Sequence, residues 1–218
     1  MAAAVSSRET EITTEPHLML TPTGVLYAFA EPDPPAECAS LQLLMAHNSA
    51  PLRSEWLALD PNHEELLPRA LENSWVEALH HPVTAPQMRL DDFLSHAIAG
   101  LSGSRTVALA TGDGFCIARV GYSQEQADVL CAAAADFLDY ARRQQSRGLK
   151  NATLGRAISI FNDIDLLLPA TSFIPFWIDG SAWWLVIDGE PLINNTALVQ
   201  LLWNIRLSGS RFMPESLR

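Results

Sequence analysis

The sequence predicts an α+β fold in which helices flank an antiparallel sheet. Apolar runs joined by short glycine turns, such as VALATGDGFCIARVG at 107–121, indicate β-hairpins. Hairpins join neighbouring strands too closely for parallel crossovers, so the sheet is predicted to be antiparallel. Segments with apolar residues three and four positions apart alternate with these runs and indicate amphipathic helices. A chain of 218 residues is long enough to bury a substantial core.

The first part of the chain is predicted to hold a β-hairpin followed by a small helical module. Apolar runs at 18–20 and 25–29 flank Thr-Pro-Thr-Gly, which is typical of a turn. Three short helices are predicted over 36–80, and the third begins at Asp60 with Pro61 in its first position. In outline these helices resemble a winged-helix module.

Composition sets the predicted boundaries. The segment 1–16 lacks the hydrophobic stretch of a signal peptide and is predicted to be a flexible tail. The N-terminal hairpin and three-helix module then occupy 17–80. The sequence HHPVTAPQ holds two prolines and predicts a linker at 81–88. An α/β domain is predicted over 89–210, followed by a second tail at 211–218.

A helix and a hairpin open the second predicted domain. Leu94, Ala97, Ile98 and Leu101 share one helical stripe, and the hairpin follows at 106–120. Its TGDG turn lacks the lysine and hydroxyl residue of a phosphate-binding loop. Glycine and aspartate tolerate the positive φ that such turns need, so the turn is predicted to be structural.

The next helix has the clearest pattern in the chain. Ser123 and Gln126 predict a capping box at its start, and Gly148 can end it. Its predicted buried face consists of Ala127, Leu130, Cys131, Ala134, Phe137, Leu138 and Ala141.

About four more strands are predicted in RAISIFNDIDLLLPA and SFIPFWIDGSAWWLVIDG, which gives six in this domain. Asp179-Gly180 between two aromatic-rich runs is a strong hairpin signal. A last helix is predicted from Asn194 or Asn195 to Leu207, with Leu198, Leu201, Leu202 and Ile205 facing inward.

Composition and motifs argue against nucleic-acid binding, a membrane span and catalysis. A net charge of −11 makes binding to nucleic acid unfavourable. No apolar run approaches ~18 residues, so we expect no membrane span and a cytoplasmic location. Cys38, Cys116 and Cys131 form no CxxC pair and are predicted to be reduced and buried. The sequence contains no GxSxG, HxxxH or HExxH motif, so we predict no catalytic residue, no metal and no cofactor.

Two groups of residues are candidates for a protein interface. Successive residues of a strand point to opposite faces, so one of two neighbouring tryptophans is exposed unless a partner or the N-terminal part covers it. Core packing and an interface role both account for the aromatic hairpin. Arginines near residue 145 either complete a helix end or receive an acidic partner. The candidates are Trp177, Trp183, Trp184, Phe137, Arg142, Arg143 and Arg147.

Residues 89–208 resemble the roadblock/LC7 family. The matching stretches are TVALATGDGFCIARVG with ADVLCAAAADFLDYARR and, more loosely, SAWWLVIDG with the final helix. That family has a leading helix, a hairpin with an acidic glycine turn, a long alanine-rich helix, further strands and a closing helix. It usually has five strands, whereas six are predicted here. A profilin-like or GAF-like sandwich would give the same pattern.

The resemblance implies a non-enzymatic regulatory or scaffold protein. It implies a homodimer formed through strand and helix faces of residues 105–145, and partners such as a small Ras-like GTPase or a polarity or motility complex. One alternative is a transcription-associated regulator whose 36–80 module contacts nucleic acid. Its third helix carries Glu64, Glu65 and Glu72, so protein contacts are expected there instead. Another alternative is a GAF-like small-molecule sensor with a pocket behind the aromatic hairpin.

Overall fold

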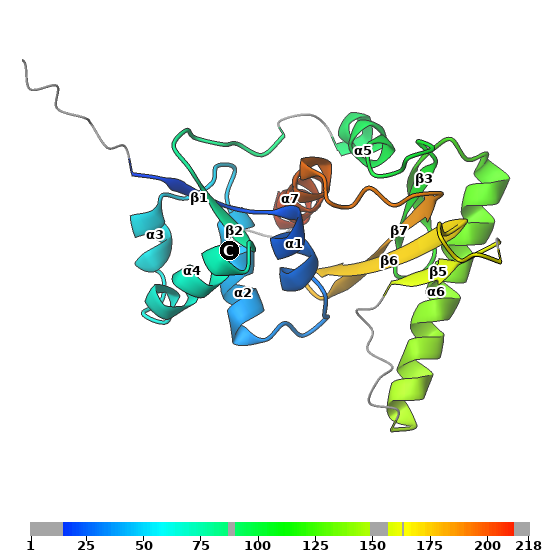
Figure 1. Ribbon diagram of the computed structural model, residues 1–218, viewed down its shortest axis with the longest axis horizontal. Helices are drawn as coiled ribbons and strands as arrows, with labels where there is room; N and C mark the ends of the chain where they lie inside the picture. The colour runs from blue at the N-terminus through cyan, green and yellow to red at the C-terminus, as the bar shows by residue number, and fades with distance from the viewer. Residues whose placement is uncertain (1–14, 87–89, 149–156, 163, 212–218) are drawn as a thin grey trace, which may run out of the picture.

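The computed structural model describes residues 15–86, 90–148, 157–162 and 164–211. It confirms an α+β fold in which helices flank an antiparallel sheet. A small helical module lies at one end of the molecule and the main sheet at the other, with the C-terminal helix between them (Figure 1).

The main sheet has five strands, all antiparallel to their neighbours. Their order across the sheet is β4-β3-β7-β6-β5, so β4 and β5 form its two edges. The strands are β3 (Val107–Thr111), β4 (Cys116–Val120), β5 (Ile158–Ile160), β6 (Thr171–Ile178) and β7 (Ser181–Asp188).

The sixth predicted strand is wrong. The second apolar run of RAISIFNDIDLLLPA, at 164–168, forms a turn and irregular backbone instead of a strand. Leu166 has a φ of 50°, which lies outside the range of extended backbone. An apolar run alone does not provide a strand to pair with: β6 is already paired on both sides, and the side chains of Ile164 and Leu167 stay exposed.

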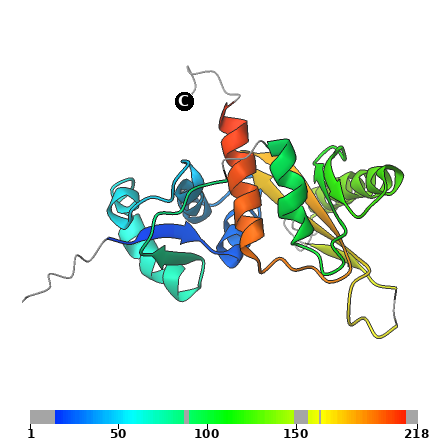
Figure 2. The ribbon, with the colours of Figure 1, turned by 90° about the horizontal axis from the view of Figure 1, so that it is seen from above.

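Helices cover both faces of this sheet. α5 (Leu90–Ala99) and α7 (Thr196–Arg211) pack together on one face, and α6 (Gln124–Ser146) lies on the other (Figure 2). The last helix, α7, ends at Arg211, beyond Leu207, where the sequence predicted its end. The two faces bury separate apolar clusters, which we call the first core, on the α5 and α7 face, and the second core, on the α6 face.

The N-terminal part folds as helices closed by a two-stranded sheet. Its elements are β1 (His17–Leu20), α1 (Pro22–Ala28), α2 (Ala36–Gln42), a 3₁₀ turn (Leu43–Met45), α3 (Arg53–Leu57), α4 (His63–Glu72) and β2 (Val76–Leu79). β1 pairs with β2 antiparallel, although almost the whole module separates them in sequence.

The predicted N-terminal hairpin is therefore wrong. Thr-Pro-Thr-Gly starts a helix instead of a turn, because the Thr21 hydroxyl accepts a hydrogen bond from the Gly24 amide and Pro22 stands at the first helical position. Gly24 is required for close packing, since a Cβ there would lie 1.9 Å from the Trp75 carbonyl oxygen. The strand that follows α4 pairs with β1 and does not turn back on itself as a wing.

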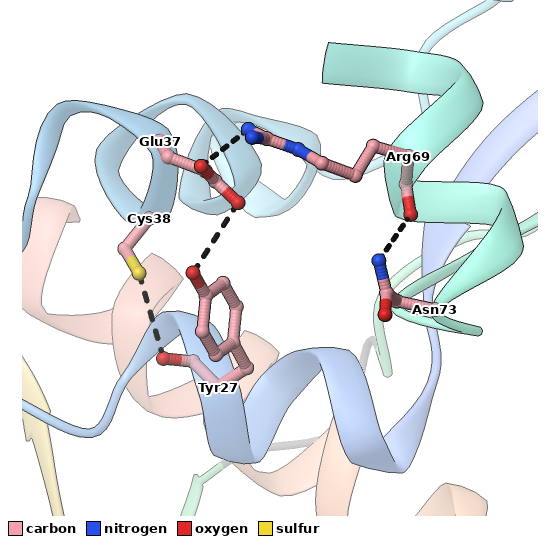
Figure 3. A network of polar contacts seen from close by, with 5 residues as sticks. All are labelled: Tyr27, Glu37, Cys38, Arg69 and Asn73. Carbon is pink, nitrogen blue, oxygen red and sulfur yellow. Dashed lines mark hydrogen bonds and ion pairs between the residues drawn. The ribbon is translucent and has the colours of Figure 1, made fainter.

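A polar network joins three helices of this module (Figure 3). The Tyr27 hydroxyl donates to Glu37 over 3.2 Å, and Arg69 forms an ion pair with the same carboxylate. The Cys38 thiol donates to the Tyr27 carbonyl oxygen. The Tyr27 ring stacks on Trp75 at 4.0 Å between centroids. These contacts hold α1, α2 and α4 together.

The first core continues from the N-terminal module into the sheet. Its buried residues run from Leu18 in β1 to Leu207 in α7. The Trp203 indole nitrogen donates to the His47 carbonyl oxygen over 2.8 Å, and the Trp177 amide donates to the Phe29 carbonyl oxygen over 2.9 Å. The predicted linker is partly integrated into the fold, since Ala85 is buried in the first core and its amide donates to the Asn48 carbonyl oxygen over 2.8 Å. Residues 87–88 of this linker lie outside the described residues, as do 1–14 and 212–218 of the predicted tails.

Candidate protein-binding surface

α6 begins as the sequence predicts. The Gln126 amide donates to the Ser123 hydroxyl over 3.2 Å, and the Ser123 amide donates to the Gln126 side chain over 3.0 Å. This capping box satisfies two amide groups that the helix cannot pair itself. The fully buried stripe of α6, which packs on the sheet, consists of Ala127, Cys131, Ala134 and Leu138.

A second stripe of uncharged residues runs along α6 beside the buried one. Its members follow each other at alternating spacings of four and three residues, which is typical of a helix that packs against another helix. The stripe consists of Gln126, Leu130, Ala133, Phe137, Tyr140 and Gln144. Leu130, Ala133 and Phe137 are half-buried at the margin of the second core, and Tyr140 is 56% exposed. No helix covers this stripe among the described residues.

The edge strand β5 lies on the same side of the second core. Ile158 is half-buried against that core, and the Phe137 ring contacts Phe173 of the neighbouring strand edge-on at 4.9 Å. β5 pairs with β6 only, so its outer edge has unpaired backbone groups in the described structure.

An exposed apolar segment follows β5. Ile164 is 96% exposed and Leu167 is 80% exposed, and Figure 2 shows this connection, in yellow, extending away from the other elements. The exposed large apolar residues of β5 and this segment are Ile160, Phe161, Ile164, Leu166, Leu167 and Leu168. Concentrations of exposed apolar residues are typical of interaction sites. We use the name α6–β5 surface for the second stripe of α6, β5 and these six residues together; Phe137 and Ile158 both pack at the second core, whereas the segment after β5 extends away from α6 (Figure 2).

The predicted tryptophans lie elsewhere. Trp177 and Trp184 are 2% exposed and belong to the second core, which corrects the prediction that they form an interface. Trp183 points to the opposite face, as strand alternation predicts, and is half-buried against the first core. Trp184 is therefore covered within the chain, whereas Trp183 stays partly exposed and lines a surface cavity together with Arg142.

The predicted arginines are exposed. Arg142 and Arg143 lie in the C-terminal part of α6, and Arg147 is its C-cap. Arg142 forms an ion pair with Asp139 at 3.5 Å and lines a surface cavity of about 380 Å³ beside the TGDG turn. The acidic Glu125 stands in the first turn of the same helix, so α6 is acidic at its start and basic at its end.

The TGDG turn has the structural role that the sequence predicts. The Gly114 amide donates to the Thr111 carbonyl oxygen, and the Gly112 amide donates to the Ala182 carbonyl oxygen over 2.8 Å. Gly114 has a φ of +84°, and a Cβ there would lie 3.0 Å from the Cys131 carbonyl oxygen. The turn therefore reverses the chain while its backbone lies directly against α6.

Three further observations concern metal binding, membrane insertion and nucleic-acid binding. No cluster of three or more histidine, cysteine, aspartate or glutamate side chains placed to hold a metal occurs among them. None of the helices in the described ranges combines the length and apolar character needed to cross a bilayer. α4, the third helix of the predicted winged-helix module, presents Glu64 and Glu65 to solvent, which would repel a phosphate backbone.

Most of the α6–β5 surface was not predicted from the sequence. Only Phe137 was among the predicted interface residues, and 164–168 was assigned to a strand. One signal in α6 did point to it. Leu130 and Phe137 lie beside the fully buried stripe that contains Cys131, so apolar residues cover a wider arc of the helix than packing on the sheet requires. No comparable signal marked Ile164 to Leu168, since apolar runs are equally typical of buried strands.

Comparisons with known proteins add one partial likeness. No model of a known protein family matches the sequence, and no curated protein matches it. A solved structure, the Roadblock/LC7 domain from Streptomyces avermitilis, aligns with 57% of this chain and 96% of its own length. The two are 16% identical, and the TM-score is 0.32. At this TM-score the likeness carries no argument about function, and the fold rests on this chain's own strands and helices.

Proposed function

We propose that this protein is a non-catalytic, protein-binding regulatory or scaffold protein that forms a homodimer through the α6–β5 surface. The observation that carries the proposal is the second stripe of α6. It is uncharged along five turns of the helix, has the spacing of a helix–helix seam, and lacks a covering element in the described structure. A second copy of the same helix supplies a seam of the same spacing.

The charges beside the stripe favour an antiparallel pair. Glu125 lies on one flank of the stripe at the start of α6, and Arg143 and Arg147 lie on the same flank at its end. In an antiparallel pair the acidic start of one helix faces the basic end of the other, whereas Asp136, at the middle of the helix, faces neither end. A parallel pair would place like charges together, which is unfavourable.

The segment after β5 supports the same surface. Exposed leucine and isoleucine side chains gain about 25 cal/mol for each Å² removed from water, so burying several of them against a partner is strongly favourable. The unpaired edge of β5 can add a strand from the second copy, which extends the sheet.

Two alanines of α6 allow a matched test. Ala133 lies in the stripe, whereas Ala132 is exposed next to it and points away from it. We expect the wild-type protein to have the mass of a dimer by light scattering at micromolar concentration. Ala133→Arg is expected to give a monomer, and Ala132→Arg is expected to leave the dimer intact. Circular dichroism of both variants checks that they are folded. A monomeric wild type, or equal loss in both variants, contradicts the proposal.

A charge exchange tests the antiparallel arrangement. Arg143→Glu with Arg147→Glu places acid opposite acid, and we expect the dimer dissociation constant to rise by about tenfold, since exposed pairs contribute up to about 1 kcal/mol each. Adding Glu125→Arg restores opposite charges at this contact and should recover part of the affinity. If this added substitution weakens the dimer further, the helices are not antiparallel.

The partner class that the sequence resemblance implies is a small Ras-like GTPase. A dimer would offer such a GTPase two copies of every surface of the monomer that stays exposed. Titration of the dimer with such a GTPase loaded with GDP or with a GTP analogue, followed by calorimetry, tests this directly. Binding is expected to be stronger for one nucleotide state, and equal absence of binding in both states contradicts this choice of partner while leaving the dimer test intact.

A further inference from the structure

Two cysteines from different elements meet at the margin of the second core. Cys116 opens β4 and is half-buried, whereas Cys131 lies in the middle of α6 and is fully buried. Both side chains pack in the second core, and the Cys116 thiol donates to the Ala118 carbonyl oxygen over 3.6 Å. Both are free cysteines.

The turn between β3 and β4 explains why they meet. Gly114 lies against the backbone of α6, where its Cβ position is 3.0 Å from the Cys131 carbonyl oxygen and 3.1 Å from the Ala132 Cα. A register shift in β3 between Leu109 and Ala110 then pairs Ala110 with Cys116. Ala110 points into the second core, so its neighbour Cys116 is carried to the same side of the sheet as α6.

We propose that Cys116 and Cys131 form a dithiol site that reacts with a small disulfide, such as oxidised glutathione, to join β4 to α6 by a disulfide. The proposal does not depend on the proposed function. Disulfide formation brings two sulfur atoms to about 2 Å, so it requires the side chains of these two neighbours in the second core to turn toward each other.

The exchange proceeds in two balanced steps. The Cys116 thiolate attacks one sulfur of oxidised glutathione, which forms a mixed disulfide and releases one glutathione thiolate. The Cys131 thiolate then attacks the Cys116 sulfur, which closes the protein disulfide and releases the second glutathione. Two electrons pass from the cysteine pair to the small disulfide, and the two protons of the cysteines end on the two glutathione thiols.

The pKa and the solvent exposure of the two thiols determine which of them attacks first. Burial, then the neighbouring Cys116 and the charge of Asp128, together raise the pKa of Cys131 to about 12. Burial also raises the pKa of Cys116, but the neighbouring Cys131 and the charge of Arg119 oppose that rise. Cys116 is also the thiol that solvent reaches. It therefore attacks first, at a rate that rises about tenfold for each pH unit, as the thiolate fraction does below the pKa.

Mass spectrometry of the full-length protein tests the site. The reduced protein is incubated with oxidised glutathione at pH 7.5 and pH 8.5, unreacted thiols are alkylated under denaturing conditions, and the peptides are mapped. We expect one disulfide, between Cys116 and Cys131, formed about tenfold faster at the higher pH. Cys38, which is buried in the N-terminal module, serves as an internal control and should be recovered alkylated.

Single substitutions separate the two steps. Cys131→Ser should accumulate the mixed disulfide at Cys116, because no second thiol resolves it, whereas Cys116→Ser should react with no glutathione. The proposal is overturned if wild type stops at the mixed disulfide, if Cys38 enters the linkage, or if the native protein stays reduced while the urea-unfolded chain is fully oxidised under the same conditions.

Discussion

One face of the five-stranded sheet packs against α5 and α7 and, through them, against the N-terminal module, whereas among the described residues the other face packs against α6 alone. The first core is closed, because elements from both ends of the chain surround it. The second core is open at its side, where Leu130, Ala133, Phe137 and Ile158 are only half-buried. The two faces of one sheet therefore differ in how completely the chain covers them.

From this difference we expect the closed side to determine the stability of the fold and the open side to bind partners. The closed side contains the contacts that join the N-terminal module to the sheet, such as Trp203 to His47. The open side contains the uncovered stripe of α6 and the exposed residues after β5. If this assignment is correct, substitutions on the closed side change stability, and substitutions on the open side change association.

The largest expected effect is in the closed core. Trp203 is 1% exposed and its indole nitrogen is hydrogen-bonded, so Trp203→Ala leaves a cavity and an unpaired carbonyl group. We expect a loss of about 3–5 kcal/mol in the free energy of unfolding, measured by urea denaturation.

Phe137→Ala is the matched comparison on the open side. Its ring is half-buried, so removal should cost about 1–2 kcal/mol in the monomer, according to the area that it buries. Equal losses for the two substitutions would remove the distinction between a closed and an open core.

The next largest expected effect concerns the packing of the β3–β4 turn against α6. Gly114→Ala combines a positive φ with a Cβ 3.0 Å from the Cys131 carbonyl oxygen, so we expect a loss of about 2–3 kcal/mol. Gly180 also has a positive φ, but a Cβ there meets nothing within 4 Å. Gly180→Ala should therefore cost only about 1–2 kcal/mol. Thermal unfolding of the two variants measures the difference, and a larger loss at Gly180 would show that the turn does not bear on α6.

Local signals predicted the second half of the chain well. The capping box of Ser123 and Gln126 and the turn at Asp179-Gly180 both use residue types that fix the backbone without help from distant contacts. The predicted strand alternation also placed Trp183 and Trp184 correctly on opposite faces. These features depend on residues only a few positions apart.

The errors arose where distant contacts decide. Thr-Pro-Thr-Gly suits both a turn and a helix start, and the pairing of β1 with β2 selects the helix. Whether a tryptophan is exposed depends on which helices cover the sheet, which the spacing of Trp177 and Trp184 does not specify. The exposed segment 164–168 was missed for the same reason, because its side chains lack a covering element that sequence alone would have to supply.

A smaller effect is expected at the start of α6. Ser123→Ala removes the side-chain acceptor of the Gln126 amide, and loss of such a cap costs about 1 kcal/mol. If the homodimer depends on an intact α6, the same substitution should weaken association slightly, which sedimentation velocity can measure. A stability loss above about 2 kcal/mol would exceed what one cap provides and would indicate a further role for Ser123.

The smallest effect on stability, and the clearest on association, is expected in the segment after β5. Leu167 is 80% exposed, so Leu167→Ser removes almost no buried contact and should change the free energy of unfolding of the monomer by less than about 0.5 kcal/mol. The proposed dimer buries this side chain, so the substitution should raise the dimer dissociation constant by about tenfold or more. Leu59, which is 61% exposed on the N-terminal module, provides the control, since Leu59→Ser should change neither quantity. A loss of stability without a change in association would place Leu167 in the fold and not in the interface, because only a contact made within one copy can stabilise the monomer.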